Sequence, residues 1–326
     1  MSLPKVAIIS LGGTISSLGA RGVAPKLTAK ELVEDVPRIT EHAHVVPIRS
    51  KQLPSSAITF GDLLDVSDEV RRQFESGTDG VVITQGTDTM EETAFFFDVV
   101  VDSDKPVVVT GAMRNPTLPG NDGPSNLLSA VQVAATKKTR GLGTLVVINE
   151  EIHLARYVQK THTSSISALE SPLTGPVGWI TEGEVTVALR PGHHPHITIE
   201  KDSPEKRVAL LKVVLDDDGA LLDAMEPSGF DGLVVEGTGG GHVPPVMASK
   251  IARLAKKIPV VLSSRTGSGQ VLRHTYGHPG AEIDLISKGM IPAMSLSGPK
   301  ARVLLYLLLR SGRQRKEICR AFQEWS

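Results

Sequence analysis

Short aliphatic and β-branched runs alternate along the chain with longer amphipathic stretches. The short runs predict buried strands, at residues 6–10, 80–84, 106–110 and 145–149. The longer stretches predict helices, at residues 28–36, 59–75, 89–97 and 127–135. This alternation predicts an α/β fold, in which a mainly parallel sheet carries helices on both faces.

Two of these helix starts carry the capping-box pattern, a threonine followed three residues later by a glutamate. The pairs are Thr28 with Glu31 and Thr89 with Glu92. In such a box, each side chain accepts a hydrogen bond from the backbone N–H of the other residue. We therefore expect both threonines to be N-caps.

The pattern changes over residues 189–207, which hold three prolines and the histidines His193, His194 and His196. We interpret this segment as an interdomain connection, because prolines and polar residues concentrate in loops. A histidine-rich tract can also bind a metal ion. A solvated linker is the simpler interpretation, and we expect no metal site.

Strand-like and helix-like runs resume beyond this segment and predict a smaller second α/β domain. They lie at residues 208–215, 232–236, 259–263, 300–309 and 318–322. The expected organisation is a larger N-terminal domain at 1–190, a linker at 191–210 and a C-terminal domain at 211–326.

The composition narrows the functional classes. The chain has 326 residues, and its net charge of −1 gives no electrostatic case for nucleic acid or an acidic membrane surface as a partner. The lone cysteine, Cys319, excludes an intrachain disulfide framework and a cysteine-rich metal site. Because no signal-peptide pattern is visible and the apolar run 303–309 is too short to span a bilayer, we expect a cytoplasmic protein.

Polar turns follow the first two buried strands of the N-terminal half. Gly12-Gly13-Thr14 follows one strand and Thr87-Asp88 the other. In an open α/β sheet, ligands bind at the carboxyl ends of strands. Taken singly, each turn has a plain structural interpretation, as a helix cap or a common strand-to-helix turn. Together, two hydroxyls and a carboxylate predict chemistry with a hydroxyl nucleophile.

A hydroxyl nucleophile needs a proton acceptor. Lys160 follows the strand at 145–149 and precedes a polar run. A lysine can accept a proton if burial or neighbouring charge holds it near neutrality, although an isolated lysine is usually a surface residue. Lys160 is therefore the candidate base, and no cofactor is expected.

At this point the motifs resemble those of the bacterial-type L-asparaginases, the two-domain asparaginase/glutaminase family. Gly12-Gly13-Thr14-Ile15 is similar to that family's first signature, and residues 86–94 are similar to its second. Shorter matches extend over nearly the whole chain, at residues 105–108, 111–114, 122–127, 160–161, 171–178, 263–265 and 300–302.

The resemblance implies catalytic roles for four residues. Thr14 falls on the primary nucleophile of the family, and Thr87, Asp88 and Lys160 fall on its second catalytic group. Asp88 also matches the residue that binds the α-amino group of the substrate. The implied reaction is hydrolysis of the side-chain amide of L-asparagine to L-aspartate and ammonia.

The resemblance also implies substrate contacts and an assembly. Ser55 matches the serine that holds the α-carboxylate, and Ser56 replaces a glutamine common in relatives. Glu282 matches an acidic residue that relatives lend across a dimer. The implied assembly is a homodimer or homotetramer with active sites at subunit interfaces.

Departures from the family pattern leave the substrate open. Residues 15–27 contain no aromatic residue, although many relatives carry a tyrosine there. Gln85 replaces a histidine, and His242 closes a glycine-rich turn where secreted relatives have an asparagine. A glutaminase, a hydrolase of another small carboxamide and a non-catalytic amino-acid-binding protein are the alternatives. A dinucleotide-dependent oxidoreductase is disfavoured, because the first strand is not followed by Gly-x-Gly-x-x-Gly.

Overall fold

The computed structural model describes residues 2–19, 22–192 and 195–325. The chain divides into two compact units, Met1–His196 and Ile197–Ser326. Each unit is described by itself below.

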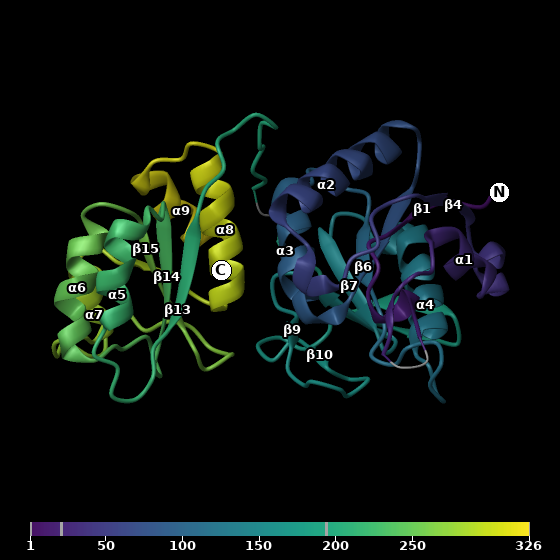
Figure 1. Cartoon of the computed structure of the whole chain (residues 1–326). Helices are drawn as coiled ribbons and strands as arrows, with labels where there is room; N and C mark the ends of the chain where they lie inside the picture. Colours follow the sequence, from purple (N-terminus) through teal and green to yellow (C-terminus); the bar gives the residue numbers. More distant parts are fainter. Residues whose placement is uncertain (1, 20–21, 193–194, 326) are drawn as a thin grey trace. The chain divides into compact units, whose positions relative to one another are not determined.

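The first unit is built on an eight-stranded sheet whose larger part is parallel (Figure 1). The parallel strands, in spatial order, are β4 (His44–Ile48), β1 (Lys5–Ser10), β5 (Gly80–Thr84), β6 (Val107–Thr110) and β7 (Thr144–Ile148). The sheet continues with antiparallel strands, β8 (Glu151–Leu154), β11 (Gly178–Thr181) and β12 (Glu184–Val187). The predicted strands and the mainly parallel sheet are confirmed.

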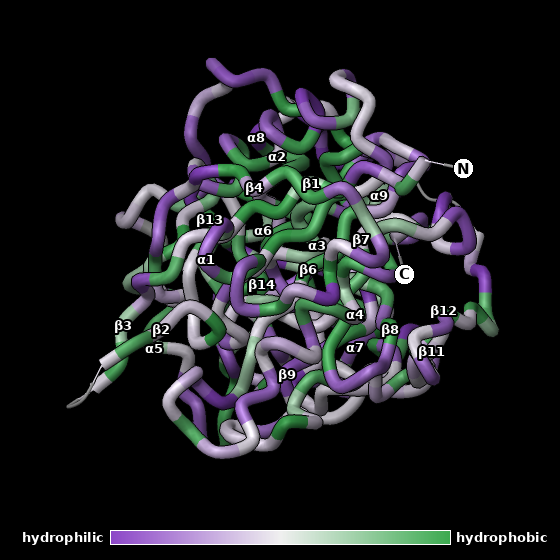
Figure 2. The backbone as a smooth tube through the Cα atoms, turned by 90° about the vertical axis from the view of Figure 1, so that its right-hand side faces the viewer, coloured by the Kyte–Doolittle hydropathy of each residue, from purple (hydrophilic) through white to green (hydrophobic). Residues whose placement is uncertain are grey.

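Helices cover both faces of this sheet, as predicted. One face carries α1 (Ala29–Glu34) and α4 (Gly123–Ala135), and the other carries α2 (Phe60–Glu75) and α3 (Met90–Val100) (Figure 1). Every residue of β5 is buried for this reason, since a parallel strand covered on both faces reads as a continuous apolar run. Figure 2 shows β1 and β6 mostly in the hydrophobic colour.

The strand order reverses beside β1. The chain passes from β1 to β4 on one side, and then returns to β5 on the other side of β1. The helices that follow β1 and β5, α1 and α3, lie on opposite faces of the sheet. The loops after β1 and β5 therefore diverge at a topological switch point, where open α/β sheets bind their ligands.

The two predicted capping boxes have different outcomes. Thr28 and Glu31 form the expected reciprocal pair at the start of α1. Thr89 is the N-cap residue of α3, but the predicted capping box with Glu92 is wrong, because the Thr89 side chain makes no cap hydrogen bond. A 3-10 turn, Thr87–Thr89, precedes α3 and gives Thr89 φ −116° and ψ 17°. Its hydroxyl donates instead to the carbonyl oxygen of Ser55, at 3.1 Å.

The second unit is a smaller parallel α/β layer, as predicted. Its strands follow one another in order, β13 (Val208–Lys212), β14 (Gly232–Gly237), β15 (Val260–Ser264) and β16 (Ile291–Pro292). One face carries α5 (Ala220–Met225), α6 (Pro245–Ala255) and α7 (Glu282–Ser287), and the other carries α8 (Gly298–Arg310) and α9 (Arg315–Glu324) (Figure 1). Every helix in the described part of the chain is too short or too polar to cross a membrane.

Candidate active site

Three of the predicted residues form one continuous hydrogen-bonded group. The ammonium of Lys160 donates to Thr87 Oγ1 at 2.8 Å and to Asp88 Oδ1 at 2.5 Å. Thr87 is 4% exposed, whereas the side chains of Lys160 and Asp88 are 14% and 71% exposed. The partly buried lysine thus lies between a buried hydroxyl and a carboxylate that faces solvent.

The elements explain how these side chains meet. Thr87 and Asp88 open the 3-10 turn directly after β5. Lys160 lies on β9 (Gln159–Lys160), which pairs with β10 (Leu169–Glu170) in a short antiparallel hairpin. The backbone N–H of Lys160 donates to Glu91 Oε1 on α3, at 3.4 Å. The hairpin is therefore fastened to the helix that the Thr87 turn begins.

Thr14 stands on the neighbouring loop, after β1. Gly12 and Gly13 have φ values of 103° and 84°, which favour glycine. A Cβ atom on Gly13 would lie 2.0 Å from the backbone nitrogen of Gly86, so the two loops are in backbone contact. Thr14 is partly exposed, and within the described part of the chain its hydroxyl has no hydrogen-bond partner.

Ser55 joins this group, whereas Ser56 does not. Ser55 is 6% exposed, and its hydroxyl donates to Asp88 Oδ2 over a long 3.5 Å. A Cβ atom on Gly86 would lie 2.9 Å from Ser55 Cβ, so only glycine allows this approach. Ser56 is exposed on the same 3-10 turn, Ser55–Ala57.

Glu282 belongs to the second unit and is fully buried. Its Oε1 accepts from the backbone N–H groups of Thr275 and Tyr276, at 2.9 and 2.6 Å. Its Oε2 lies 3.0 Å from His242 Nε2. Burial opposes ionisation, but these hydrogen bonds outweigh it and lower the pKa of Glu282. The carboxylate is thus occupied within its own unit, and its role toward a substrate stays a prediction.

Sequence reasoning missed Met113, whose sulfur touches the group. Thr87 Oγ1 donates to Met113 Sδ at 3.3 Å. Met113 lies in the loop after β6. Residues 111–114 match the family, but the match implied no role for Met113. A methionine carries no sequence signal for such a contact, because most methionines are core residues.

The histidines at positions 193, 194 and 196 were the candidate metal ligands. His193 and His194 lie outside the described residues, and His196 Nδ1 is 3.2 Å from Asp102 Oδ1. Among the described residues, no group of three or more His, Cys, Asp or Glu side chains is arranged to hold a metal ion.

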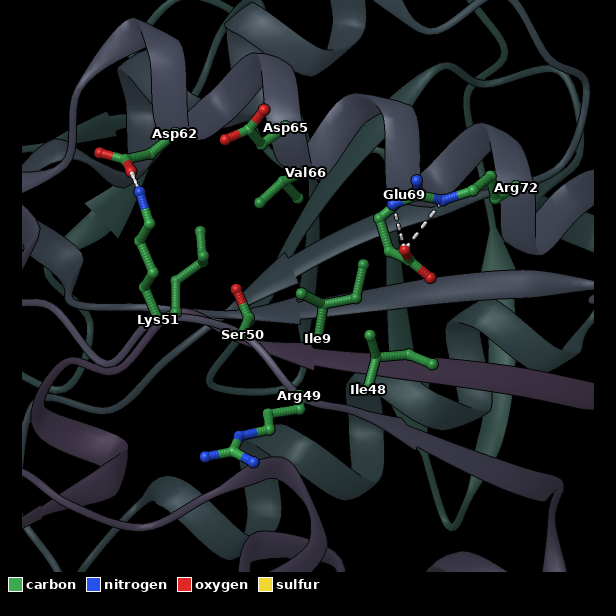
Figure 3. A pocket seen from close by; sticks show the side chains of 11 residues that line it. Ile9, Ile48, Arg49, Ser50, Lys51, Asp62, Asp65, Val66, Glu69 and Arg72 are labelled. Carbon is green, nitrogen blue, oxygen red and sulfur yellow. Dashed lines mark hydrogen bonds and ion pairs between the residues drawn. The ribbon is translucent and has the colours of Figure 1, made fainter.

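A pocket of about 170 Å³ lies between α2 and the ends of β1 and β4 (Figure 3). It is lined by none of the predicted site residues. Lys51 pairs with Asp62 at 2.5 Å, and Glu69 pairs with Arg72 at 2.5 Å (Figure 3). These four charges are thus paired with one another.

Two family models match the chain in succession. The model described as "Asparaginase, N-terminal" covers residues 5–192, and that described as "Glutaminase/Asparaginase C-terminal domain" covers residues 207–322. Together they span both compact units.

Whole-length relatives agree with these models. The L-asparaginase of Bacillus licheniformis is 36% identical over 312 residues, covering 94% of this chain and 96% of that protein. The probable L-asparaginase of Deinococcus radiodurans is 38% identical over 332 residues, covering 99% and 98%. The crystal structure of a probable cytoplasmic L-asparaginase from Campylobacter jejuni superposes with a TM-score of 0.89 at 33% identity, covering 98% of this chain and 99% of that one.

Proposed function

The chain belongs to the asparaginase family of amidohydrolases, and from this membership we propose that it hydrolyses L-asparagine through a threonine nucleophile. The products are L-aspartate and ammonia. The observation that carries the mechanism is the chain of contacts from Asp88 through Lys160 to Thr87.

The two threonines take different parts in this reaction. Thr14 attacks the carboxamide carbon, the C–N bond breaks, and the nitrogen leaves as ammonia after receiving a proton. Water then cleaves the threonyl ester and releases the acid. Thr14 suits attack because its hydroxyl is partly exposed and has no partner among the described residues. Thr87 suits proton transfer, because its oxygen is buried and already bonded to Lys160.

Lys160 supplies the proton acceptor in its neutral form. Asp88 Oδ1 lies 2.5 Å from the Lys160 amine and holds it within reach of Thr87. Neutral Lys160 takes the proton from Thr87, and Thr87 takes the proton of the attacking hydroxyl. Positioned acid–base groups of this kind contribute about 10²- to 10⁴-fold to rates.

Substrate recognition uses two polar side chains of the same cluster, the exposed Asp88 and the buried Ser55. Asp88 would pair with the α-amino group, and Ser55 would donate to the α-carboxylate. Ser56 and the segment 15–27 lack the glutamine and the aromatic residue that relatives offer near the head group. Each lost hydrogen bond costs about 0.5–1.5 kcal/mol, so we expect a KM for asparagine near about 1 mM, in the upper part of the usual range.

The decisive experiment measures ammonia release from L-asparagine by the purified protein and by Thr14→Ala. We expect turnover by the natural chain and at least about a 10³-fold loss in the variant, since nucleophile removal costs about that much or more. Equal rates would show that Thr14 is not the nucleophile. A chain that releases no ammonia from asparagine, glutamine or simple amides would be a binding protein.

The second candidate is a related amide substrate. The shorter Ser56 leaves room beside the head group, which favours glutamine or a bulkier carboxamide. Ranking asparagine, glutamine, D-asparagine and amides without an α-amino group by kcat/KM separates these substrates. A lead for L-asparagine of more than about a hundredfold with a micromolar KM would contradict the weakened head-group contacts.

A further inference from the structure

We propose that Met113 positions the Thr87 hydroxyl and is the site at which peroxide inactivates the enzyme; the proposal rests on the amidohydrolase function above. Thr87 Oγ1 accepts from Lys160 Nζ at 2.8 Å and donates its own hydrogen to Met113 Sδ at 3.3 Å. The thioether therefore sets the direction of the hydroxyl that mediates proton transfer.

The position of the Met113 sulfur is fixed by contacts of the loop after β6. The backbone N–H of Met113 donates to Asp122 Oδ2 at 3.0 Å, and the amide of Asn126 donates to the same oxygen at 3.0 Å. At Gly111, a Cβ atom would lie 2.4 Å from the carbonyl oxygen of Gln85. Only glycine there lets the Met113 loop lie against the Thr87 turn.

A weak acceptor suits this position for a chemical reason. The Thr87 hydrogen must turn from its resting partner toward Lys160 whenever the neutral amine takes it. A thioether sulfur is a weak acceptor, so it orients the hydroxyl and releases it at little cost. A carbonyl or sulfoxide oxygen is a stronger acceptor and would hold the hydrogen away from Lys160.

Oxidation converts the weak acceptor into a strong one. Peroxide transfers one oxygen to the sulfur, the O–O bond breaks, the thioether is oxidised to a sulfoxide, and the peroxide is reduced to water. Met113 is partly exposed, so a small oxidant reaches it. The new oxygen would be bound to the sulfur atom that now accepts the Thr87 hydrogen, at 3.3 Å from Thr87 Oγ1.

The first test compares two substitutions of similar size. Met113→Leu removes the acceptor, and we expect kcat to fall about two- to threefold, as for loss of one weak hydrogen bond. Met113→Gln introduces an amide oxygen, and we expect kcat to fall at least about tenfold with KM changed less than about threefold. Thermal unfolding should be the same in both variants. If Met113→Gln is as active as Met113→Leu, the orientation role is wrong.

The second test treats the natural chain, Met113→Leu, Met225→Leu and Cys319→Ser with hydrogen peroxide. Met225 is a partly buried methionine of the second unit, and burial raises the pKa of the Cys319 thiol, which makes it a poor competitor for the oxidant. We expect activity loss to follow oxygen addition to Met113 by mass spectrometry, and methionine sulfoxide reductase to restore turnover. Met113→Leu should resist, and the other two variants should be inactivated like the natural chain.

The outcomes separate this proposal from the function on which it rests. An untreated natural chain without amidase activity overturns both. If the natural chain is active, but peroxide inactivates it and the Met113→Leu variant equally fast, only the role of Met113 is overturned. Complete oxidation of Met113 with activity retained does the same.

Discussion

At the scale of single residues, Lys160 joins the buried hydroxyl of Thr87 to the exposed carboxylate of Asp88. We predict that Lys160→Met lowers kcat at least about 10²-fold, the low end for a positioned acid–base group, while KM changes less. Steady-state kinetics on asparagine would measure both constants.

A matched variant separates charge from proton transfer at this position. Arginine stays charged at every working pH, so Lys160→Arg keeps the cation beside Asp88 but removes the proton acceptor. We expect it to be as slow as Lys160→Met. Recovery of activity with arginine would mean that only the charge matters.

His153 gives a second residue-scale prediction, on stability. It is 1% exposed on β8, with Nδ1 3.0 Å from Ser171 Oγ, and burial lowers its pKa from 6.5 to about 4. The unfolded chain therefore binds a proton near pH 6.5 that the folded chain takes up only near pH 4. This contribution to stability is complete above the unfolded pKa and is lost as the pH falls from 6.5 to 4.

Urea unfolding at several pH values would measure this effect. Between pH 7.5 and 4.5, we expect His153 to account for a loss of about 2–3 kcal/mol in the free energy of unfolding. The loss should disappear in His153→Gln and persist in His44→Gln, a change at an exposed histidine of β4. An equal pH slope in all three proteins would contradict a buried neutral His153.

The sequence predicted the site residues that have reactive side chains, but not the residue whose role depends only on its position in the fold. Thr87, Asp88 and Lys160 were found because hydroxyls, carboxylates and amines at strand ends carry a chemical signal, and the structure brings the three together. Met113 was missed because its contact depends on a loop path fixed by Asp122 and Gly111. Such a path is a tertiary property and leaves no local pattern.

At the scale of elements, the backbone contact between the loops after β1 and β5 supports the site. We predict that Gly13→Ala lowers both stability and kcat, because Gly13 combines φ 84° with a Cβ position 2.0 Å from Gly86 N. Positive-φ strain alone costs about 1–2 kcal/mol, and displacement of the loop adds to it.

Gly77→Ala is the matched control for this prediction. Gly77 has φ 88°, but a Cβ atom there meets no atom within 4 Å. We expect Gly77→Ala to show the strain in denaturant unfolding with unchanged kcat. Equal kinetics in the two variants would mean that the contact between the loops does not matter for turnover.

The hydrophobic pattern predicted strands best where helices cover both faces of the sheet, and worst toward the antiparallel edge of the sheet. β1, β5, β6 and β7 are continuous apolar runs and were predicted. β8, β11 and β12 were not predicted, because each has only four residues and pairs antiparallel in a register that depends on its neighbours. The capping box predicted at Thr89 fails because the 3-10 turn Thr87–Thr89 gives Thr89 φ −116° and ψ 17°.

At the scale of the whole molecule, we propose that activity requires association of subunits, as the family resemblance implies. The groups assembled around Lys160 all belong to the first unit, whereas Glu282, for which the resemblance implies a part across a dimer, belongs to the second. Diluting the protein until sedimentation shows folded monomers should abolish turnover, because a site shared between subunits is lost on dissociation. Fully active monomers would refute this.

The hairpin that carries Lys160 has a consequence for how the enzyme fails on heating. β9 and β10 have two residues each, whereas Thr87 follows β5, a five-residue strand buried throughout. The amide hydrogens of β5 should exchange only through global opening, and those near Lys160 through a cheaper local fluctuation. We expect hydrogen–deuterium exchange to mark residues 159–170 as a separate, less protected unit, and reversible activity loss to begin several degrees below the melting temperature. Heat would then detach Lys160 from the Thr87 hydroxyl before it unfolds either domain.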